Sequence, residues 1–293
     1  MSFITPLVPF AERWIITMRI CSIASGSSGN CIYVGSDATH LLVDVGISGK
    51  RTEAGLKELD LSMQDIDGIF ITHEHTDHIA GLGVLARKYG VPVFATRGTI
   101  EAIKKTASVG EIPEELFQTV YADEKVIVKD IVCNPMRISH DAAEPVAYRI
   151  SHGKKKVGIV TDLGTYNDYT VECLKEMDAL LLEANHDVNM LQVGPYPYYL
   201  KQRILGDRGH LSNERAGQLL CDLLHDKLQA VVLGHLSKEN NLPELAYESV
   251  RVEVTMACMN KERSENSFPC IKTSDFPMYV ASRSQPSQVI HIA

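Results

Sequence analysis

Three histidines and one aspartate that could bind a metal ion lie within six residues of the chain, in the segment HEHTDH at 73–78. Neutral imidazoles suit borderline ions such as Zn²⁺, and a carboxylate adds compensating negative charge. The four side chains are His73, His75, Asp77 and His78. A polar loop whose histidines only cap a helix is the alternative, but four potential ligands in so short a segment favour a metal site.

Three further candidate ligands each follow a short apolar run that predicts a strand. His140 follows MRIS, Asp162 follows VGIVT and His235 follows VVLG. A single histidine after a strand is usually a surface residue, but three such positions beside a loop that needs more ligands favour a shared site. We expect the seven side chains to hold two divalent ions. A His/Asp set is compatible with both Zn²⁺ and Mn²⁺.

The hydrophobic pattern predicts the elements that must position these side chains. The ligand loop lies between a predicted buried strand at 66–72 and an amphipathic helix at 77–89, with Thr76 as N-cap and Gly90 as the stop. The other predicted strands are 19–24, 31–34, 40–44, 131–138, 146–151, 156–161, 179–183 and 230–233, and the other predicted helices are 50–59, 99–107, 197–204 and 214–224. Strands and helices therefore alternate in two halves of similar size.

Composition is that of an ordinary globular protein, with 293 residues of which 45% are hydrophobic and 23% charged. We expect one hydrolase domain at 18–293, preceded by a possible N-terminal extension at 1–17. The stretch beyond about residue 254 is hard to interpret, and its Ser/Pro-rich end, SRSQPSQ, predicts loose order. The seven cysteines are odd in number and lack a C-x-x-C pair, which argues against a disulfide scaffold and a zinc ribbon.

Targeting and membrane signals are missing from the sequence. No apolar run approaches the roughly 20 residues that cross a bilayer, and the first residues lack the basic start and cleavage site of a signal peptide. We therefore expect a cytoplasmic protein with no membrane partner. The net charge of -8 gives no global basic field, so any binding of nucleic acid must depend on local charge.

The ligand motifs resemble those of the metallo-β-lactamase superfamily of metal hydrolases. HEHTDH matches its H-x-H-x-D-H signature, TDLG matches its bridging strand-end aspartate, and Asp44 in LLVDVG matches an early aspartate that supports the metal loop. The resemblance covers about 18–245. It implies an α/β (α+β) protein, a four-layer αββα sandwich with the site at one edge of the sheets. It also implies that one ion is held by His73, His75, His140 and Asp162, and the other by Asp77, His78, Asp162 and His235.

Further motifs resemble the nuclease branch of that superfamily. SIASGSSGNCIYV, ITHEHTDHIAGL, ISHDAAEPVAYRI, ILGDRGHLSN and LGHLSKENN look like the YycJ/WalJ family of bacterial proteins. This resemblance implies a 5′-to-3′ exonuclease that acts on DNA, single- or double-stranded. Antibiotic hydrolysis is disfavoured, because the best-known β-lactamases lack a histidine at the position of His78. A glyoxalase II-like thioesterase is disfavoured because its C-terminal helical region has no obvious counterpart.

The expected chemistry uses a hydroxide that bridges the two ions, whose pKa the metals lower toward neutrality. The ions would also offset the charge that builds in the transition state. Asp77 would be mainly a ligand and could orient the hydroxide. Glu183 in LLEAN and His210 in GHLSN resemble a pair in the tRNA 3′-processing endonucleases, so His210 would steady the phosphate or protonate the leaving oxygen, with Glu183 orienting it. A buried polar pair of structural value only is the alternative.

Polar and basic residues around these motifs are candidates for substrate contact. The loop SGSSGN at 25–30 could cradle a phosphate, although a glycine-rich turn needs no such role. Basic residues at 201–208 lie beside Tyr196, Tyr198 and Tyr199, which suits single-stranded nucleic acid or, equally, a helix with its tyrosines packed inward. The lysines of HGKKK predict a solvated hairpin tip, with phosphate contact as the alternative. The candidates are Ser27, Ser28, Asn30, Asn185, His186, Lys201, Arg203, Arg208 and Ser212.

Two other functions compete with a nuclease. A small-molecule hydrolase could act on a thioester, a lactone or a cyclic phosphodiester, and the negative net charge favours it. A non-catalytic binding module is disfavoured, because all seven ligands are present and loss of even one would be the usual mark of decay.

Overall fold

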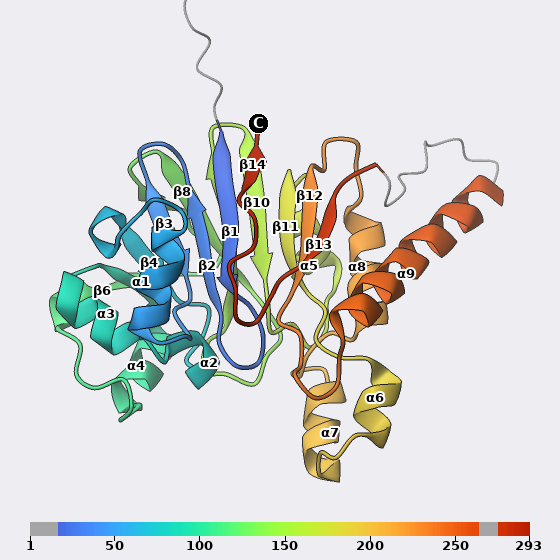
Figure 1. Cartoon of the computed structure of the whole chain (residues 1–293), viewed down its shortest axis with the longest axis horizontal. Coiled ribbons are helices and arrows are strands. Elements are labelled where there is room, and N and C mark those ends of the chain that lie inside the picture. Colours follow the sequence, from blue (N-terminus) through green and yellow to red (C-terminus); the bar gives the residue numbers. More distant parts are fainter. Residues whose placement is uncertain (1–16, 264–274) are drawn as a thin grey trace, which may run out of the picture.

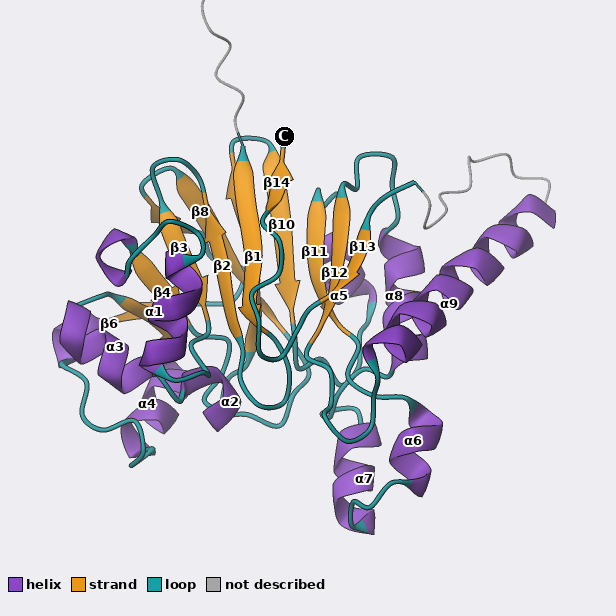
Figure 2. Ribbon diagram, in the orientation of Figure 1, coloured by secondary structure: helices purple, strands orange, loops and turns teal. Residues whose placement is uncertain are grey.

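Two seven-stranded sheets pack face to face between two layers of helices in the computed structural model, which describes residues 17–263 and 275–293 (Figures 1 and 2). The first sheet has the order β14 (Ile290–Ile292), β1 (Met18–Ala24), β2 (Cys31–Gly35), β3 (His40–Val43), β4 (Gly68–Phe70), β5 (Val93–Thr96) and β6 (Phe117–Val120). The second has the order β13 (Met278–Val280), β12 (Ala230–Gly234), β11 (Ala179–Glu183), β10 (Lys155–Val160), β9 (Val146–His152), β8 (Ile131–Arg137) and β7 (Val126–Val128). The predicted four-layer αββα sandwich is confirmed. The predicted extension at 1–17 lies, except for its last residue, outside the described residues.

Helices cover the outer face of each sheet. The first sheet is covered by α1 (Gly49–Lys57), α3 (Leu82–Tyr89) and α4 (Arg97–Lys105), and the second by α5 (Asp168–Leu174), α8 (Asn213–Leu223) and α9 (Pro243–Arg263). The short α2 (Thr76–Ile79) belongs to the ligand loop. Figure 1 shows that α6 (Val188–Val193) and α7 (Tyr198–Leu205) extend away from the sandwich at one end of the sheets.

Three apolar layers hold the four structural layers together. Side chains alternate between the two faces of a strand, so in β2 Ile32 and Val34 point to the opposite sheet while Cys31 and Tyr33 point to the helices. Both faces of each sheet are covered, and the central strands are therefore apolar at almost every position. This explains the continuous hydrophobic runs that the sequence shows before each ligand.

The ligand-bearing strands end at the same edge of the sandwich. In the first sheet β3 and β4 run parallel, and in the second β10, β11 and β12 run parallel. Strand β8 has the same direction as β10, because each pairs antiparallel with β9. Residues that directly follow these strands are therefore brought to one edge, as the sequence predicted.

The predicted strand and helix around the ligand loop are shorter than expected. Strand β4 ends at Phe70, because the Thr72 amide donates to the Asp44 carboxylate at 2.9 Å instead of to a strand carbonyl. The predicted helix at 77–89 is divided into α2 and α3. A Cβ on Gly81 would lie 2.3 Å from the Ile47 carbonyl oxygen, so this residue must be glycine where the chain passes so close. The N-cap of α2 is His75 and not Thr76.

The C-terminal stretch is more regular than the sequence suggested. Strands β13 and β14 extend the two sheets at their edges, and α9 packs through Ala246, Val250 and Val254. The segment SRSQPSQ, expected to be loosely ordered, is bonded to β1 and the loop after it, since Ser287 N donates to Ser22 O at 2.8 Å and Ser25 N to Ser282 O at 3.0 Å. Of the stretch beyond residue 254, residues 264–274 lie outside the described residues. No helix in the described part combines the length and apolar character that a bilayer crossing needs.

Replacement of Tyr148 by phenylalanine should destabilise the protein. Tyr148 is completely buried between the sheets, its ring lies edge-on to Phe70, and its hydroxyl donates to the Ile71 carbonyl at 2.8 Å. Tyr148→Phe leaves that buried carbonyl without its donor, which should lower the free energy of unfolding by about 1–3 kcal/mol. Urea denaturation followed by circular dichroism measures this. The control Tyr121→Phe removes a hydroxyl from a side chain that is 53% exposed and should leave the midpoint nearly unchanged. Equal midpoints for wild type and Tyr148→Phe would contradict the prediction.

Candidate metal centre

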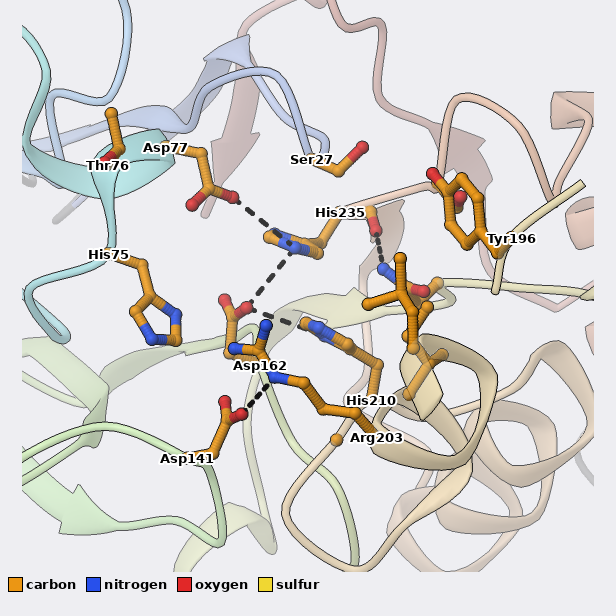
Figure 3. A pocket seen from close by; sticks show the side chains of 15 residues that line it. Ser27, His75, Thr76, Asp77, Asp141, Asp162, Tyr196, Arg203, His210 and His235 are labelled. Carbon is orange, nitrogen blue, oxygen red and sulfur yellow. Dashed lines mark hydrogen bonds and ion pairs between the residues drawn. The ribbon is translucent and has the colours of Figure 1, made fainter. Parts of the chain in front are cut away.

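All seven predicted ligands meet at the edge where their strands end. Four of them, His75, Asp77, Asp162 and His235, line a cleft of about 400 Å³ (Figure 3). The loop that follows β4 contributes four of them, and the segments after β8, β10 and β12 contribute one each. Two groups of potential ligand atoms, each within 4.8 Å of one another, are His73, His75 and His140, and Asp77, His78 and His235. Asp162 belongs to two further groups, one with His73 and His78 and one with His235.

Left-handed backbone turns aim three of the site's side chains. Asp44, Asp162 and His235 have φ of 59°, 60° and 54°, and each lies one or two residues after the end of a strand. For an L-residue this conformation costs about 1–2 kcal/mol, and Asp and His tolerate it better than most residues. Each of these turns ends its strand abruptly. The site therefore contains three residues with an unfavourable backbone conformation, which is typical of functional sites.

The hydrogen bonds of His78 and His140 fix which ring nitrogen faces the cleft. Nδ1 of His78 lies 2.7 Å from Oδ2 of Asp44, and Nδ1 of His140 lies 3.1 Å from the carbonyl oxygen of Gly209. A carboxylate or carbonyl oxygen can only accept, so in each neutral ring the proton is on Nδ1. The lone pair of Nε2 is then free to bind a metal ion, the arrangement that orients histidine ligands in metal sites.

Asp44 sets the orientation of His73 through Thr72. The Thr72 hydroxyl donates to Oδ2 of Asp44 at 2.9 Å and lies 3.0 Å from Nδ1 of His73. Because its own proton goes to the carboxylate, the hydroxyl oxygen accepts from His73, and Nε2 of His73 is again left with its lone pair. Asp44 is 2% exposed. The expected support of the metal loop by Asp44 is thus visible as a set of hydrogen bonds.

Three imidazole nitrogens of the first group converge. Nε2 of His73 lies 3.0 Å from Nδ1 of His75, which lies 3.2 Å from Nε2 of His140. Ligand atoms about 2.1 Å from a tetrahedral ion are separated by roughly 3.4 Å, so these spacings fit a common cation.

Asp162 faces ligands of both groups. Its Oδ1 lies 3.3 Å from Nε2 of His235 and 3.7 Å from Nε2 of His140, and its Oδ2 lies 3.1 Å from Nε2 of His78. Oδ2 is buried and has no hydrogen-bond donor of good geometry within the described residues. A buried carboxylate oxygen that has no such donor and lies among the imidazoles of both groups is what a divalent metal site requires, so the residues fit the implied ions.

The charges of the site compensate one another. Burial alone would raise the pKa of the Asp162 carboxyl, but the imidazoles of His235, His78 and His73 hold it well below its usual range. Burial lowers the pKa of both His73 and His140, so these rings stay neutral. Burial also opposes protonation of His78, but the carboxylates around it, Asp162 first, raise its pKa well above normal. A metal ion that binds Nε2 of His78 must therefore displace a proton.

The backbone of Asp77 is fixed by its contacts with Asn30 and Gly46. Its carbonyl oxygen accepts from the Asn30 amide at 2.8 Å, and a Cβ on Gly46 would lie 1.6 Å from that oxygen. Oδ2 of Asp77 is 3.5 Å from Nε2 of His78 and 3.9 Å from Nε2 of His235, as expected for a ligand of the second group. Gly46 therefore has a role that the sequence analysis missed, because nothing in VDVGISG marks the close approach of a distant loop.

Asn30 supports the ligands and does not face the cleft, which corrects its expected contact with substrate. Its side chain is 1% exposed. Oδ1 accepts from Gly26 N at 3.0 Å and lies 3.3 Å from Nδ1 of His235, and Nδ2 lies 3.2 Å from Nε2 of His78. The loop at 25–30 thus packs behind the second group of ligands, with only Ser27 on the cleft surface.

Glu183 and His210 form the expected pair. Nδ1 of His210 donates to Oε1 of Glu183 at 2.7 Å, while Oε2 accepts from the backbone amides of Leu163 at 2.7 Å and Leu211 at 3.2 Å. Glu183 lies near Asp162 and His235, but its oxygens are already engaged, so we assign it to the orientation of His210 and not to metal binding. Burial would lower the pKa of His210, but Glu183 above all raises it to about 9, and the ring is protonated at neutral pH.

Three expected substrate contacts line the cleft. They are Ser27, Asn185 and Arg203 (Figure 3 labels Ser27 and Arg203). Arg203 is paired through Nε with Asp141, which also lines the cleft and lies 3.5 Å from Nε2 of His140. Asp141 was not singled out in the sequence, because the aspartate after His140 carries no motif of its own.

The other expected contacts lie beside or beneath the cleft, where they support the structure. His186 is 1% exposed and pairs with Asn185, and burial lowers its pKa to about 4. Arg208 donates twice to the carbonyl of His140, and Lys201 donates to the carbonyl of Gln192. Ser212 caps α8, and Ser28 is exposed but does not line the cleft. These positions correct the expectation of direct contact for His186 and Ser212, whose side chains are buried.

Two alternatives left open by the sequence are resolved by burial and pairing. Tyr198 and Tyr199 are 77% and 74% exposed, so they do not pack inward. Lys155 and Lys156 form ion pairs with Asp178 and Glu176, near the opposite end of β10 from Asp162. The HGKKK turn is therefore a hairpin tip and not part of the metal centre.

Comparisons with known proteins agree with the geometry of the cleft. A family model described as the beta-lactamase superfamily domain matches residues 39–235. The chain is 45% identical to "Exodeoxyribonuclease YycJ" of Bacillus anthracis over 229 residues, which cover 78% of this chain and 86% of the relative. It is 40% identical to "Exodeoxyribonuclease WalJ" of Streptococcus pneumoniae serotype 2 over 242 residues, 83% and 90% of the two chains.

Solved structures show the same fold at low sequence identity. The metallo-beta-lactamase fold protein YhfI from Bacillus subtilis is 17% identical with a TM-score of 0.65, over 94% of this chain and 99% of that one. The short form of human tRNase Z is 16% identical with a TM-score of 0.61, with the same coverage. These likenesses support the fold alone.

Replacement of Gly46 by alanine should weaken metal binding. The added Cβ would overlap the carbonyl oxygen of Asp77, and the loop that carries Asp77 and His78 must move away. Loss of support behind a ligand typically costs 10–100-fold in metal affinity, so we expect a weakening of at least about tenfold for Zn²⁺ or Mn²⁺. Calorimetric titration of chelator-treated protein measures it, with circular dichroism to confirm folding.

The matched control is Gly49→Ala, three residues along the chain. A Cβ there meets only Leu85 side-chain atoms at ordinary contact distance, 3.4 Å and beyond, and Val84 at 3.5 Å. This variant should bind metal like the wild type. If Gly46→Ala also did so while folded, the backbone of Asp77 would not be fixed in the way that the close contact indicates.

Proposed function

The chain belongs to the beta-lactamase superfamily and, within it, to the family of the exodeoxyribonucleases YycJ and WalJ, and on this premise we propose that it is a metal-dependent exodeoxyribonuclease that degrades DNA in the 5′-to-3′ direction. The observation that carries the proposal is the 45% identity to the Bacillus anthracis exodeoxyribonuclease over most of both chains. The converging histidine and aspartate ligands support it, because a phosphodiesterase of this fold needs them all. We further propose that residues 18–293 form one catalytic domain and that the enzyme acts in the cytoplasm.

We propose that the enzyme uses two divalent ions, Zn²⁺ or Mn²⁺, with Asp162 shared between them. The first ion would be held by His73, His75, His140 and Asp162, and the second by Asp77, His78, His235 and Asp162. When bound, divalent ions supply Lewis acidity toward the phosphoryl oxygens and lower the pKa of water, which provides a nucleophile near neutral pH. The chain's own residues then have to orient the phosphodiester, hold the ligands rigid and supply a proton to the leaving oxygen.

His210 is the group placed to supply that proton. Its Nδ1 is engaged with Glu183, so Nε2 is the atom that can donate. The raised pKa keeps Nε2 protonated at neutral pH, and the side chain, 21% exposed, lines the cleft beside Asp162. A protonated imidazole can also steady a phosphate oxygen, and the leaving-group test below separates the two roles. Asp77 has one carboxylate oxygen close to both histidines of its group, which suits a ligand that also orients the nucleophile.

Contact with the DNA backbone is assigned to the residues on the cleft surface. We propose that Ser27, Asn185 and Arg203 bind phosphate or sugar oxygens, since their polar groups line the cleft. Ser28 and Lys201 do not line the cleft, and we propose that they contact the strand outside it. Arg208 acts through His140, whose carbonyl it holds. The chain has a net charge of -8, so binding depends on these local groups.

Degradation of labelled DNA tests the proposed function. The substrates are 5′-labelled and 3′-labelled oligonucleotides, single- and double-stranded, with Zn²⁺ or Mn²⁺ added. We expect mononucleotides released progressively from the 5′ end, and at least a 10³-fold loss in Asp162→Ala, because that change removes the carboxylate shared by both metal sites. The control Asp168→Ala removes an exposed carboxylate six residues further along and should keep full activity.

Each outcome of that experiment has a distinct meaning. Release from the 3′ end would overturn the proposed polarity, and retained activity in Asp162→Ala would overturn the metal mechanism. If no strand is cleaved while metal is bound, the site stands but the substrate is a small ester and not DNA. Metal analysis of the active protein decides between Zn²⁺ and Mn²⁺ and counts the ions.

Removal of the imidazole of His210 should slow cleavage of DNA without loss of metal. General acid catalysis contributes about 10²–10⁴-fold, and His210→Ala should lose a factor in this range. A p-nitrophenyl ester of thymidine 5′-phosphate releases a weakly basic phenolate that needs no proton, so its cleavage should be nearly normal. Glu183→Gln should show the same pattern with a smaller loss, because the amide oxygen can still accept from Nδ1. An equal loss on both substrates would assign His210 to binding phosphate, and no loss on either would leave the pair with a structural role only.

A further inference from the structure

The helix α7 presents an apolar face to the metal cleft. Leu200 and Ile204 lie one turn apart on α7, Tyr196 lies two residues before the helix begins, and all three line the cavity that also contains Asp162 and His235. Figure 3 shows Tyr196 at the margin of this cavity. The residues of the exposed side of the helix, among them Tyr199, do not line the cavity.

This face has no core to pack against. Tyr196, Leu200 and Ile204 are half-buried, yet none of them joins or packs on the three hydrophobic clusters of the described residues. Within that part of the chain α7 has no fully buried residue. Figures 1 and 2 show the reason, since α6 and α7 extend beyond the end of the sheets. Apolar side chains that line a cleft and lack a core are suited to an apolar part of a ligand.

The helix is nevertheless fixed relative to the site. The amide of His210 donates to the carbonyl of Ile204 at 3.0 Å, and Arg203 pairs with Asp141 next to His140. The position of the apolar face is therefore fixed relative to the candidate metal ligands and to His210, the proposed acid. If the phosphate of a ligand lies beside the candidate metal ligands, the group attached to that phosphate lies against this apolar face.

We propose that Tyr196, Leu200 and Ile204 form a nucleobase-binding wall, which holds the base of a nucleotide adjacent to the scissile phosphate by stacking and apolar contact. This inference rests on the proposed function, since it needs a polynucleotide substrate. A volume of about 400 Å³ is within the range of roughly 300–1,000 Å³ that is usual for small-ligand pockets, enough for a phosphate and one nucleoside.

Such a wall would make degradation independent of base sequence. Leucine and isoleucine side chains offer no hydrogen bonds, and a tyrosine ring stacks on any base because every base has a π-face. The phosphate is held by charge and the base by contact, so neither reads the identity of the base. The same wall requires an unstacked base, and the occupant must therefore be a single-stranded end.

The test uses substrates that differ in the base alone. Single-stranded oligonucleotides carry one abasic deoxyribose, at the 5′-terminal or at the second position, and are compared with the intact strand. We expect an abasic residue at one of these positions to lower kcat/KM of the wild type roughly tenfold, the size typical of one base–aromatic stack. In Tyr196→Ala this preference for the intact strand should shrink to less than about threefold, and in Tyr196→Phe, which keeps the ring, it should persist.

Tyr199→Ala is the matched control. It removes a tyrosine of α7, three residues after Tyr196, that is 74% exposed and does not line the cavity, and it should keep the tenfold preference. Equal cleavage of intact and abasic strands by the wild type, or an undiminished preference in Tyr196→Ala, would overturn the wall while the nuclease stands. Failure of the wild type to cleave any strand would instead overturn the proposed function on which the wall depends.

Discussion

The carboxylate of Asp44 is the interaction on which the rest of the site depends. It accepts from the amide and the hydroxyl of Thr72 and from Nδ1 of His78, and through Thr72 it also orients His73. These bonds end the strand that leads to the ligand loop, and they fix the proton of both rings on Nδ1. An anion that only accepts is required here, because a group that could donate would allow the rings to turn their protons toward the metal.

The site also depends on how the two sheets pack. The first sheet supplies the ligands of the loop after β4, while the second supplies His140, Asp162 and His235. The distances between these two sets are therefore set by the apolar layer between the sheets, where Phe70 packs against Tyr148 just behind the loop. A close-packed interior transmits small changes in shape, so side chains of this layer that never touch a substrate control the geometry of the centre.

The sequence predicted which side chains converge, because metal binding demands particular residue types at strand ends, and both can be recognised locally. It also predicted most strands, since a strand buried on both faces is a continuous apolar run. It could not predict features that arise from close approach of distant segments, such as Gly46 against Asp77 or the amide of Asn30 beneath His78 and His235. Helix α9 was missed for a different reason. Those of its residues that are described as buried, Ala246, Val250, Val254 and Cys258, form a stripe only one residue wide, which produces a weak periodic signal.

The orientation of α7 illustrates the limit of pattern analysis most clearly. Basic and aromatic residues alternate in 196–208, and the sequence alone allowed either an inward or an outward set of tyrosines. The structure separates them: Tyr196 lines the cleft, and Tyr198 and Tyr199 face solvent. The difference matters because the metal centre is a property of the superfamily fold, and a fold that hosts many chemistries selects its substrate through the segments attached around it. In this chain α6 and α7 are such a segment. They are placed between β11, which carries Glu183, and α8, which follows His210, so the element proposed to meet the base is covalently continuous with the pair proposed to act on the leaving oxygen.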